Sequence, residues 1–354
     1  MHYVAKLQRA LCDKCIVALY LKFRKWNMSK YNVAVLGPIP RDHITTHHGE
    51  VIEKYGCAMH TAIGLSKLLE GRGQVHLVSH VRKQDIEEIK AILADFPNIN
   101  TEFIRCEADQ GDVIRLRFVD QNNRIEKQTG FMNPIVPRDL EGLMHCNAFV
   151  CVPISDYEVP LHTLQHIKAN STGVVIFDAH GPTNTVTTLG DRILKFWIDR
   201  DEWLPYIDVL KMNLEESNCC WFDKEIDETK LKPFDENDIS HLPAFAAHAI
   251  GNGLKSLIVT LDSNGSAVFY EDKDDVHQQL VKAIRVEHVV DTTGCGDSFA
   301  GGLGFGLLDR KDDYVRAVKF ANALGAQRTQ GRTFAVFKSL EETEEQIIQE
   351  YGTL

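Results

Sequence analysis

The chain has 354 residues and a formal net charge of −11 at neutral pH, with 44% hydrophobic and 25% charged residues. This composition is typical of a globular protein, and the negative charge makes nucleic acids and anionic membrane surfaces poor partners. No apolar run approaches the roughly 20 residues needed to cross a bilayer. Nine cysteines without regular spacing favour reduced thiols, and we therefore expect a cytoplasmic protein.

The first 27 residues differ from the rest because they contain six basic residues and only one acidic residue. Three explanations stay open for this segment: translation from a start codon upstream of the true one, a flexible or helical extension, or an acid-poor targeting peptide. We expect a basic extension over residues 1–27 that need not belong to the fold, followed by one folded domain over residues 28–354.

Short apolar runs alternate with helical patterns along most of the chain. The expected strands are 31–36, 74–79, 101–105, 148–152, 174–177, 209–212, 256–260 and 266–270, and the expected helices are 58–69, 83–94 and 315–326. This alternation is typical of βαβ units, so the predicted fold class is α/β, a doubly wound and mostly parallel sheet flanked by helices. Such sheets bind ligands at the carboxyl ends of their strands.

Two segments, about 43–56 and 109–131, break this alternation. In the second, polar and apolar side chains alternate with a period of two, which is typical of an antiparallel strand with one face in water. We therefore predict a small antiparallel β lid over the ligand site.

The segment from Asp291 to Gly302 is the most informative for chemistry. It places a turn of small residues before an amphipathic helical run, and the unpaired amides of a first helical turn stabilise an anion. A transferred phosphoryl group is such an anion, and Asp297 could accept the proton of the attacking hydroxyl. The pattern alone leaves a second interpretation open, in which Asp291 or Thr293 caps the helix and the glycines only permit close helix packing.

This segment resembles the second signature of the ribokinase-like (PfkB) carbohydrate kinase family, Asp-Thr-x-Gly-Ala-Gly-Asp, with Cys295 in place of the alanine. The resemblance implies an anion hole formed by the backbone of Gly294, Cys295 and Gly296, and Asp297 as the catalytic base. The position of Cys295 at a helix N-terminus predicts a thiol with a lowered pKa.

Residues 55–62 resemble the first signature of the family, Gly-Gly-x-x-x-Asn-x-Ala, with Tyr55 in place of the first glycine and His60 in place of the asparagine. Asp42, five positions after Gly37, matches the aspartate that binds substrate hydroxyls. The resemblance thus implies that Asp42, Gly56 and His60 bind the acceptor. Without it, Asp42 could be a solvated turn residue and His60 a packed or surface histidine.

Asn213 and Glu216 resemble the family's Asn-x-x-Glu motif, which implies that they hold Mg²⁺ through water molecules. The same spacing is also that of a helix capping box, and both interpretations can hold together. Family members often use K⁺, and the resemblance implies a possible K⁺ site around Asp291 and Thr293.

Residues 260–265 resemble the family's nucleotide-contacting turn, Thr-x-Gly-x-x-Gly, with Asp262 in place of the first glycine. The resemblance implies contacts from Thr260 and Gly265 to ATP, and from Asn322 near its base. A carboxylate at position 262 would repel the triphosphate unless it is turned away.

Taken together, the resemblance implies an ATP- and Mg²⁺-dependent kinase that transfers the γ-phosphoryl group to a hydroxyl of a sugar or sugar derivative. A nucleoside kinase of the same family would instead need an aromatic slot, which Tyr55 or Phe118 could supply. A third alternative is a non-catalytic relative that only binds a ligand. A homodimer that pairs through the lid is also expected.

Overall fold

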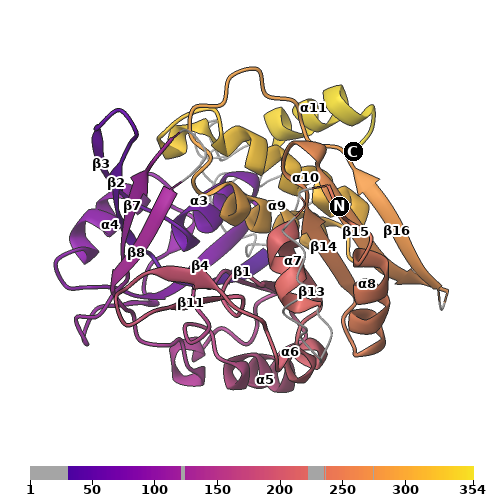
Figure 1. Cartoon of the computed structure of the whole chain (residues 1–354), viewed down its shortest axis with the longest axis horizontal. Helices are drawn as coiled ribbons and strands as arrows, with labels where there is room; N and C mark the ends of the chain where they lie inside the picture. The colour runs from indigo at the N-terminus through magenta and orange to yellow at the C-terminus, as the bar shows by residue number, and fades with distance from the viewer. Residues whose placement is uncertain (1–30, 121–123, 222–234, 236, 274) are drawn as a thin grey trace, which may run out of the picture.

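The structure, a computed structural model, describes residues 31–354 except 121–123, 222–234, 236 and 274 (Figure 1). The basic extension expected over residues 1–27 lies outside the described residues. Among the described helices, none is long and apolar enough to cross a membrane.

A ten-stranded sheet forms the centre of the molecule, with the strand order β16-β15-β14-β13-β10-β9-β1-β4-β5 and with β6 also paired to β4. Its strands are β1 (Tyr31–Leu36), β4 (Gly73–His80), β5 (Ile99–Asn100), β6 (Ile104–Arg105), β9 (Ala148–Cys151), β10 (Val174–Asp178), β13 (Val209–Asn213), β14 (Ser256–Thr260), β15 (Ser266–Asp272) and β16 (Asp275–Val281). All pairs are parallel except β14–β15 and β15–β16. The strand order reverses between β1 and β9, which is where such sheets bind ligands. The predicted fold class is confirmed.

Helices cover both faces of this sheet. One face packs against α3 (Ala58–Leu68), α4 (Ile86–Leu93), α9 (Cys295–Asp309), α10 (Tyr314–Arg328) and α11 (Leu340–Tyr351), and the other against α5 (Leu161–Asn170), α6 (Arg200–Trp203), α7 (Leu214–Cys220) and α8 (Leu242–Gly251). In β1, Val33 and Val35 belong to the first core, whereas Ala34 and Leu36 belong to the second. A strand buried on both sides reads as a continuous apolar run, which is why β1 is evident from the sequence.

The lid is a separate four-stranded sheet in the order β3-β2-β7-β8, seen at one side of the molecule in Figure 1. Its strands are β2 (Arg41–Thr45), β3 (Val51–Tyr55), β7 (Val113–Phe118) and β8 (Arg124–Gly130). Ile44, Ile114 and Leu116 bury one face, as the alternation predicted. The expected antiparallel pairing holds for β2–β3 and β7–β8, whereas the two hairpins are joined by a parallel pair, β2 and β7. Strand β2 follows β1 and strand β7 follows β6. Because β1 and β6 end at the same edge of the main sheet, β2 and β7 leave the body of the molecule in the same direction.

Three local features differ from the expectations. Of the strand expected at 101–105, only residues 104–105 form a strand, β6. A second short strand, β5, precedes this range at residues 99–100, and both pair with β4. The helix expected from residue 83 begins at Ile86. A hairpin of β11 (Asn184–Val186) and β12 (Arg192–Leu194) was not expected, because each strand has only three residues and shows no clear alternation. Short 3₁₀ segments lie at Pro137–Leu140, Leu204–Tyr206, Asp262–Asn264 and Phe334–Val336.

Helices α9 and α10 touch backbone to backbone. A Cβ on Gly302 would lie 2.5 Å from Cα of Ala321, and one on Gly306 would lie 2.4 Å from Cα of Ala317. Only glycine permits this approach, so the interpretation of these glycines as packing residues holds for the body of α9. This close packing of α9 against α10 holds the N-terminus of α9 rigidly at the edge of the sheet.

Candidate active site

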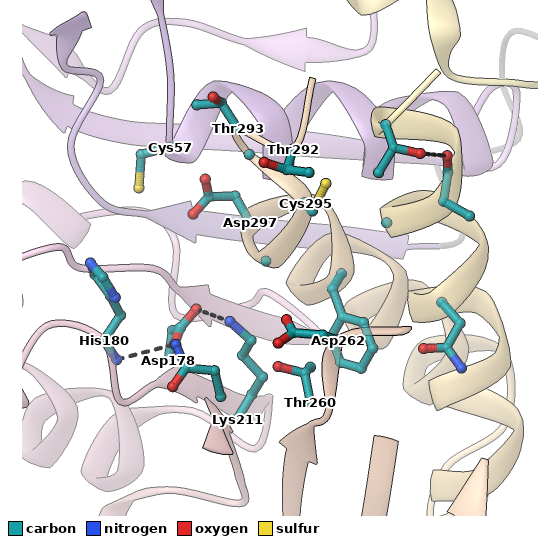
Figure 2. Close-up of a pocket in the computed structure, with 18 of the residues that line it drawn as sticks. Cys57, Asp178, His180, Lys211, Thr260, Asp262, Thr292, Thr293, Cys295 and Asp297 are labelled. Carbon is teal, nitrogen blue, oxygen red and sulfur yellow. Dashed lines mark hydrogen bonds and ion pairs between the residues drawn. The ribbon is translucent and has the colours of Figure 1, made fainter. Parts of the chain in front are cut away.

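One cavity of about 990 Å³ lies at the carboxyl ends of the central strands, partly covered by β2 and β7 of the lid. The site residues expected from the sequence line it, except Gly56, His60 and Asp291. Figure 2 shows the segment from Thr292 to Asp297 on one side of this cavity, and Asp178, His180, Lys211 and Thr260 on the other. Segments that are far apart in the chain therefore meet at one site.

The turn before α9 is shaped for an anion. Gly294 is the N-cap of the helix and has a φ of 84°, in the left-handed region that favours glycine. A Cβ there would also lie 2.4 Å from the ring of His60. The backbone amides of the first turn of α9 face no earlier turn of helix, and they lie at the positive end of a 15-residue helix. This turn can therefore stabilise a transferred phosphoryl group.

Asp297, the expected base, lies in the first turn of α9 and points into the cavity (Figure 2). Its backbone carbonyl accepts a hydrogen bond of 2.8 Å from Thr61 Oγ1, which ties the turn to α3. Burial raises the pKa of the Asp297 carboxyl, although the positive charges of Lys211 and His180 oppose the shift. A carboxylate with a raised pKa is a stronger proton acceptor than an ordinary aspartate.

Two pairs of side chains face Asp297: the ion pair of Lys211 with Asp178, and the hydrogen-bonded pair of His180 with Glu216. Of these four residues, only Glu216 was predicted from the sequence. Lys211 Nζ lies 2.7 Å from Asp178 Oδ2, and it would lie 3.0 Å from a Cβ on Gly296. His180 Nδ1 lies 2.7 Å from Glu216 Oε1. Burial tends to lower the pKa of His180, but the hydrogen bond to Glu216 and the negative charges of Glu216 and Asp178 together outweigh it, and the pKa is raised. Lys211 thus brings a positive charge beside the anion turn, and a lysine within the buried run Val209–Met212 was a usable signal.

Asn213 and Glu216 form the capping box that their spacing allows. The Asn213 side chain accepts a bond of 2.7 Å from Glu216 N, and Glu216 Oε2 accepts one of 2.8 Å from Asn213 N. A carboxylate or amide oxygen has two lone pairs, so each oxygen keeps acceptor capacity toward the cavity. Water molecules of a hydrated Mg²⁺ fit such oxygens.

The far end of the cavity is suited to a nucleotide. Thr260 and Gly265 line it, and Gly265 has a φ of 97° with no room for a side chain, because a Cβ would lie 2.1 Å from the Val281 carbonyl oxygen. Asn322 also lines it and donates to the Lys282 carbonyl and to Tyr351. The remaining lining there includes apolar residues, namely Ala283, Ile284, Val286, Val289 and Ala326, and also the polar or charged residues Asp262, Ser263, Ser266, Arg285 and Thr329. Apolar walls beside a glycine turn suit a base and its phosphates.

The lid lines the acceptor end with Asp42, which is 5% exposed, with the aliphatic Ile114 and Leu116 and with Glu126, which pairs with Arg192 of the adjoining hairpin. A Cβ on Gly56 would lie 2.6 Å from Asp42 Oδ2, so the glycine makes room for this carboxylate. The two aromatic rings considered for a nucleoside slot do not line the cavity. Tyr55 is instead buried, and its hydroxyl donates to Asp85 and Glu88.

His60 differs from its expected position. It is 2% exposed, lies behind Gly294 and does not line the cavity. Its Nδ1 accepts a bond of 3.2 Å from Arg328 Nε, and burial holds its pKa well below the usual value. In this structure a neutral His60 supports the anion turn from behind and does not touch the acceptor space.

The pKa of the Cys295 thiol also differs from the value expected from the sequence. Burial raises its pKa to about 12, and this effect outweighs the positive charge of Arg328. The lowered pKa expected from the helix N-terminus is therefore wrong, because the dipole argument ignored desolvation.

Asp291, a possible K⁺ ligand, is already paired with two side-chain cations. Its Oδ2 lies 2.7 Å from Lys54 Nζ and 3.1 Å from Arg328 Nη2, and its Oδ1 accepts a bond of 2.9 Å from Thr293 N. These residues fit a K⁺ ion poorly, because a further cation would meet two like charges.

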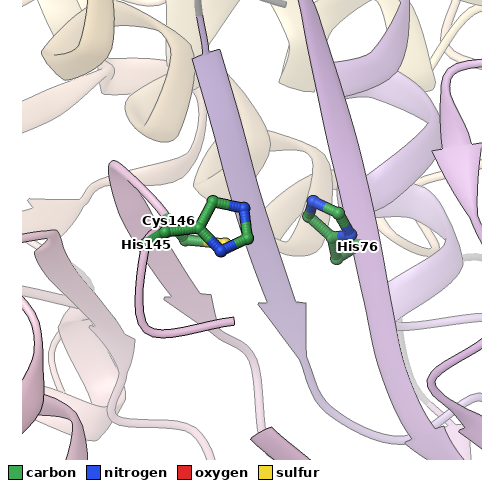
Figure 3. Close-up of side chains that lie close together, drawn as sticks. All are labelled: His76, His145 and Cys146. Carbon is green, nitrogen blue, oxygen red and sulfur yellow. The ribbon is translucent and has the colours of Figure 1, made fainter. Parts of the chain in front are cut away.

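A second cluster of side chains, His76, His145 and Cys146, lies apart from the cavity, near the amino ends of β1 and β9 (Figure 3). Both ring nitrogens of His76 already have partners, Asn32 and Asn100, and burial raises the pKa of the Cys146 thiol to about 12. We assign no role to this cluster.

Comparison with known proteins agrees with this geometry. The family model described as pfkB family carbohydrate kinase matches residues 56–334. The chain belongs to this family. As a PfkB protein it is a phosphotransferase with a hydroxyl acceptor.

Curated ribokinases are distant relatives of this PfkB protein. It is 25% identical to the Staphylococcus aureus ribokinase over 235 residues, which are 65% of this chain and 68% of that enzyme. It is 27% identical to the Arabidopsis thaliana ribokinase over 123 residues, or 35% of this chain and 28% of the enzyme. The chain therefore spans less than a third of the Arabidopsis enzyme in that match.

Solved structures share the fold at lower identity. The Giardia lamblia ribokinase matches with a TM-score of 0.69 at 18% identity, covering 91% of this chain and 99% of its own. A pyrophosphate-dependent kinase in the ribokinase family, complexed with a pyrophosphate analogue and myo-inositol, matches with a TM-score of 0.66 at 17% identity, covering 88% and 99%.

Proposed function

We propose that this protein is an ATP- and Mg²⁺-dependent kinase that transfers the γ-phosphoryl group to a hydroxyl of a sugar, a sugar derivative or a polyol. One observation carries the proposal: Asp297 and the anion turn at the start of α9 face the same cavity as Asp42 at one end and the glycine turn with Thr260 and Gly265 at the other. The donor, the base and the acceptor can therefore be aligned without moving the main sheet.

In the proposed reaction Asp297 accepts the proton of the acceptor hydroxyl, and that oxygen attacks the γ-phosphorus while the bond to the β-phosphate oxygen breaks. The amides of Gly294, Cys295 and Gly296 stabilise the charge on the moving phosphoryl group, with Lys211 beside them. Thr260, Gly265 and Asn322 hold the nucleotide. Asn213 and Glu216 would hold Mg²⁺ through water, and when bound this ion would neutralise phosphate charge.

The choice of a sugar or polyol over a nucleoside rests on the acceptor end of the cavity. Carboxylates such as Asp42 accept hydrogen bonds from the hydroxyl groups of a sugar, and Gly56 leaves the room that this carboxylate needs. Besides Asp42, the lid contributes Ile114, Leu116 and Glu126, none of which is aromatic, whereas Tyr55 and Phe118 are not in the lining. A nucleoside acceptor would lack its aromatic slot. Retention of Asp297 with the complete anion turn also disfavours a ligand-binding protein without catalysis.

Two further parts of the proposal concern the protein's setting. The cysteines that the structure describes are all free, which supports a reducing, cytoplasmic location. Exposed Ile125 on β8 and Leu189 and Ile193 on the adjoining hairpin support a homodimer through the lid. Sedimentation equilibrium would show a monomer at micromolar concentration if this dimer does not form.

The decisive experiment measures ATP consumption with Mg²⁺ against a panel of pentoses, hexoses, inositols and nucleosides. We expect one sugar or polyol to be phosphorylated, and the Asp297→Asn variant to lose about 10²- to 10⁴-fold in kcat. Binding of ATP to this variant, measured by calorimetry, should be nearly unchanged. Turnover of nucleosides alone would contradict the acceptor class, and an active Asp297→Asn variant would contradict the assigned base.

A further inference from the structure

Asp291 begins the anion turn, and its carboxylate lies between two cationic side chains from different parts of the fold. Lys54 comes from β3 of the lid, and Arg328 comes from the last turn of α10. Burial opposes ionisation of Asp291, but the Lys54 ammonium, helped by hydrogen bonds from Thr293, holds the pKa of this carboxyl well below its usual value. The carboxylate is therefore charged, and Thr293 N donates to its other oxygen.

The guanidinium of Arg328 lies beside the Asp291 carboxylate, where its positive charge opposes the binding of a further monovalent cation. Its side chain is only 1% exposed. It donates to the Asp291 carboxylate and to the Gly331 carbonyl oxygen, and its Nε donates to His60. Because each of its three nitrogens donates a hydrogen bond, the guanidinium is fixed in place and brings a full positive charge beside the Asp291 carboxylate.

Lys54 extends this group to the lid. It is 15% exposed and bonds Asp291 across 237 residues of sequence. A second ion pair between lid and body, from Glu50 to Arg332, is about half exposed and does not touch Asp291. The two pairs differ in that only the first reaches the turn that carries Gly294 and Asp297.

We propose that Lys54 and Arg328 act as built-in cations that hold the anion turn in its active shape, so that the enzyme needs no K⁺. This inference rests on the proposed kinase function for its activity readout. Lys54 is a positioning residue, because it acts through Asp291 and not on the substrate. The adjacent amides of Gly294 to Gly296 are thereby kept in place for the phosphoryl group.

The test compares the wild type with Lys54→Met in KCl, NH₄Cl, NaCl and choline chloride at equal ionic strength. We expect wild-type kcat/KM and thermal midpoint to be the same in all four salts. Lys54→Met should lose about 10- to 100-fold in kcat/KM, as is common when a supporting contact is removed. K⁺ or NH₄⁺, but not choline, should restore part of the activity and raise the thermal midpoint of this variant. Arg332→Met, which breaks the exposed pair between Glu50 and Arg332, should match the wild type and show no response to the salts.

A wild type that requires K⁺, or whose thermal midpoint rises specifically with K⁺, would overturn the proposal. So would a Lys54→Met variant that matches Arg332→Met, or one whose loss no cation reverses, since Lys54 would then be an ordinary structural tie. The thermal midpoints do not depend on turnover. If no acceptor is phosphorylated by the wild type, the kinase proposal fails while the cation proposal is still decided.

Discussion

Replacing Gly302 with alanine tests how tightly α9, and with it the catalytic turn, is fixed against α10. The new Cβ would lie 2.5 Å from Cα of Ala321 and 2.6 Å from the Phe320 carbonyl oxygen. Non-bonded carbon atoms rest at about 3.5–4.0 Å, so the helices must separate by about 1 Å. The opposing atoms are backbone and cannot move aside by changing rotamer.

Overpacking of a core typically costs 1–3 kcal/mol, and a backbone contact belongs at the upper end of that range. Alanine in a helix interior recovers about 1 kcal/mol relative to glycine. We therefore expect Gly302→Ala to lower the free energy of unfolding by about 2 kcal/mol, measured by urea denaturation. We also expect kcat to fall, because Asp297 lies on the same helix.

Gly251→Ala is the matched control, since Gly251 also lies in a helix and a Cβ there would have no neighbour within 4 Å. It should raise the free energy of unfolding by up to about 1 kcal/mol. If the two variants have equal stability, the inferred rigid contact between α9 and α10 is refuted.

Two predictions concern pH. Because burial raises the pKa of Asp297, the acid limb of the pH profile of kcat/KM should lie above the ordinary aspartate value of 3.8. In Lys211→Met this limb should move to higher pH, because the positive charge of Lys211 lowers the pKa of Asp297. Movement of the limb to lower pH would contradict the proposed electrostatics. The raised pKa of His180 should stabilise the fold fully below pH 6.5, with the stabilisation lost as pH rises through the folded-state pKa. Urea unfolding of wild type and His180→Gln across this range checks it, and equal slopes against pH would count against the pair with Glu216.

The parts of the fold that the sequence predicts well are those determined by local patterns. Strand β1 and helix α3 follow from continuous burial and from helical spacing. The turn from Asp291 to Asp297 was found because all of its residues are contiguous. The site residues that were missed, Asp178 and Lys211, end or interrupt separate buried strands. Their meeting depends on which strands are neighbours, and a single sequence does not contain that order.

The errors have the same origin. The side chain of His60 occupies the correct helix but points behind Gly294, because Arg328, 268 residues away, supplies its partner. The thiol of Cys295 was assigned from its place on a helix, whereas the tertiary packing around it decides its pKa. Both depend on contacts between distant segments and not on local spacing.

The connectivity of the lid has a consequence for the order of folding. The β2–β3 and β7–β8 hairpins each close over a short stretch of chain, but they join only through β2 and β7, whose first pair is Arg41 with Val113. The unit from α3 to β6 lies between them in the chain, so this junction cannot form until that unit has folded. The lid is therefore expected to assemble last. Native-state hydrogen exchange should find the amides of the β2–β7 seam opening together, at a lower free energy than those of β1.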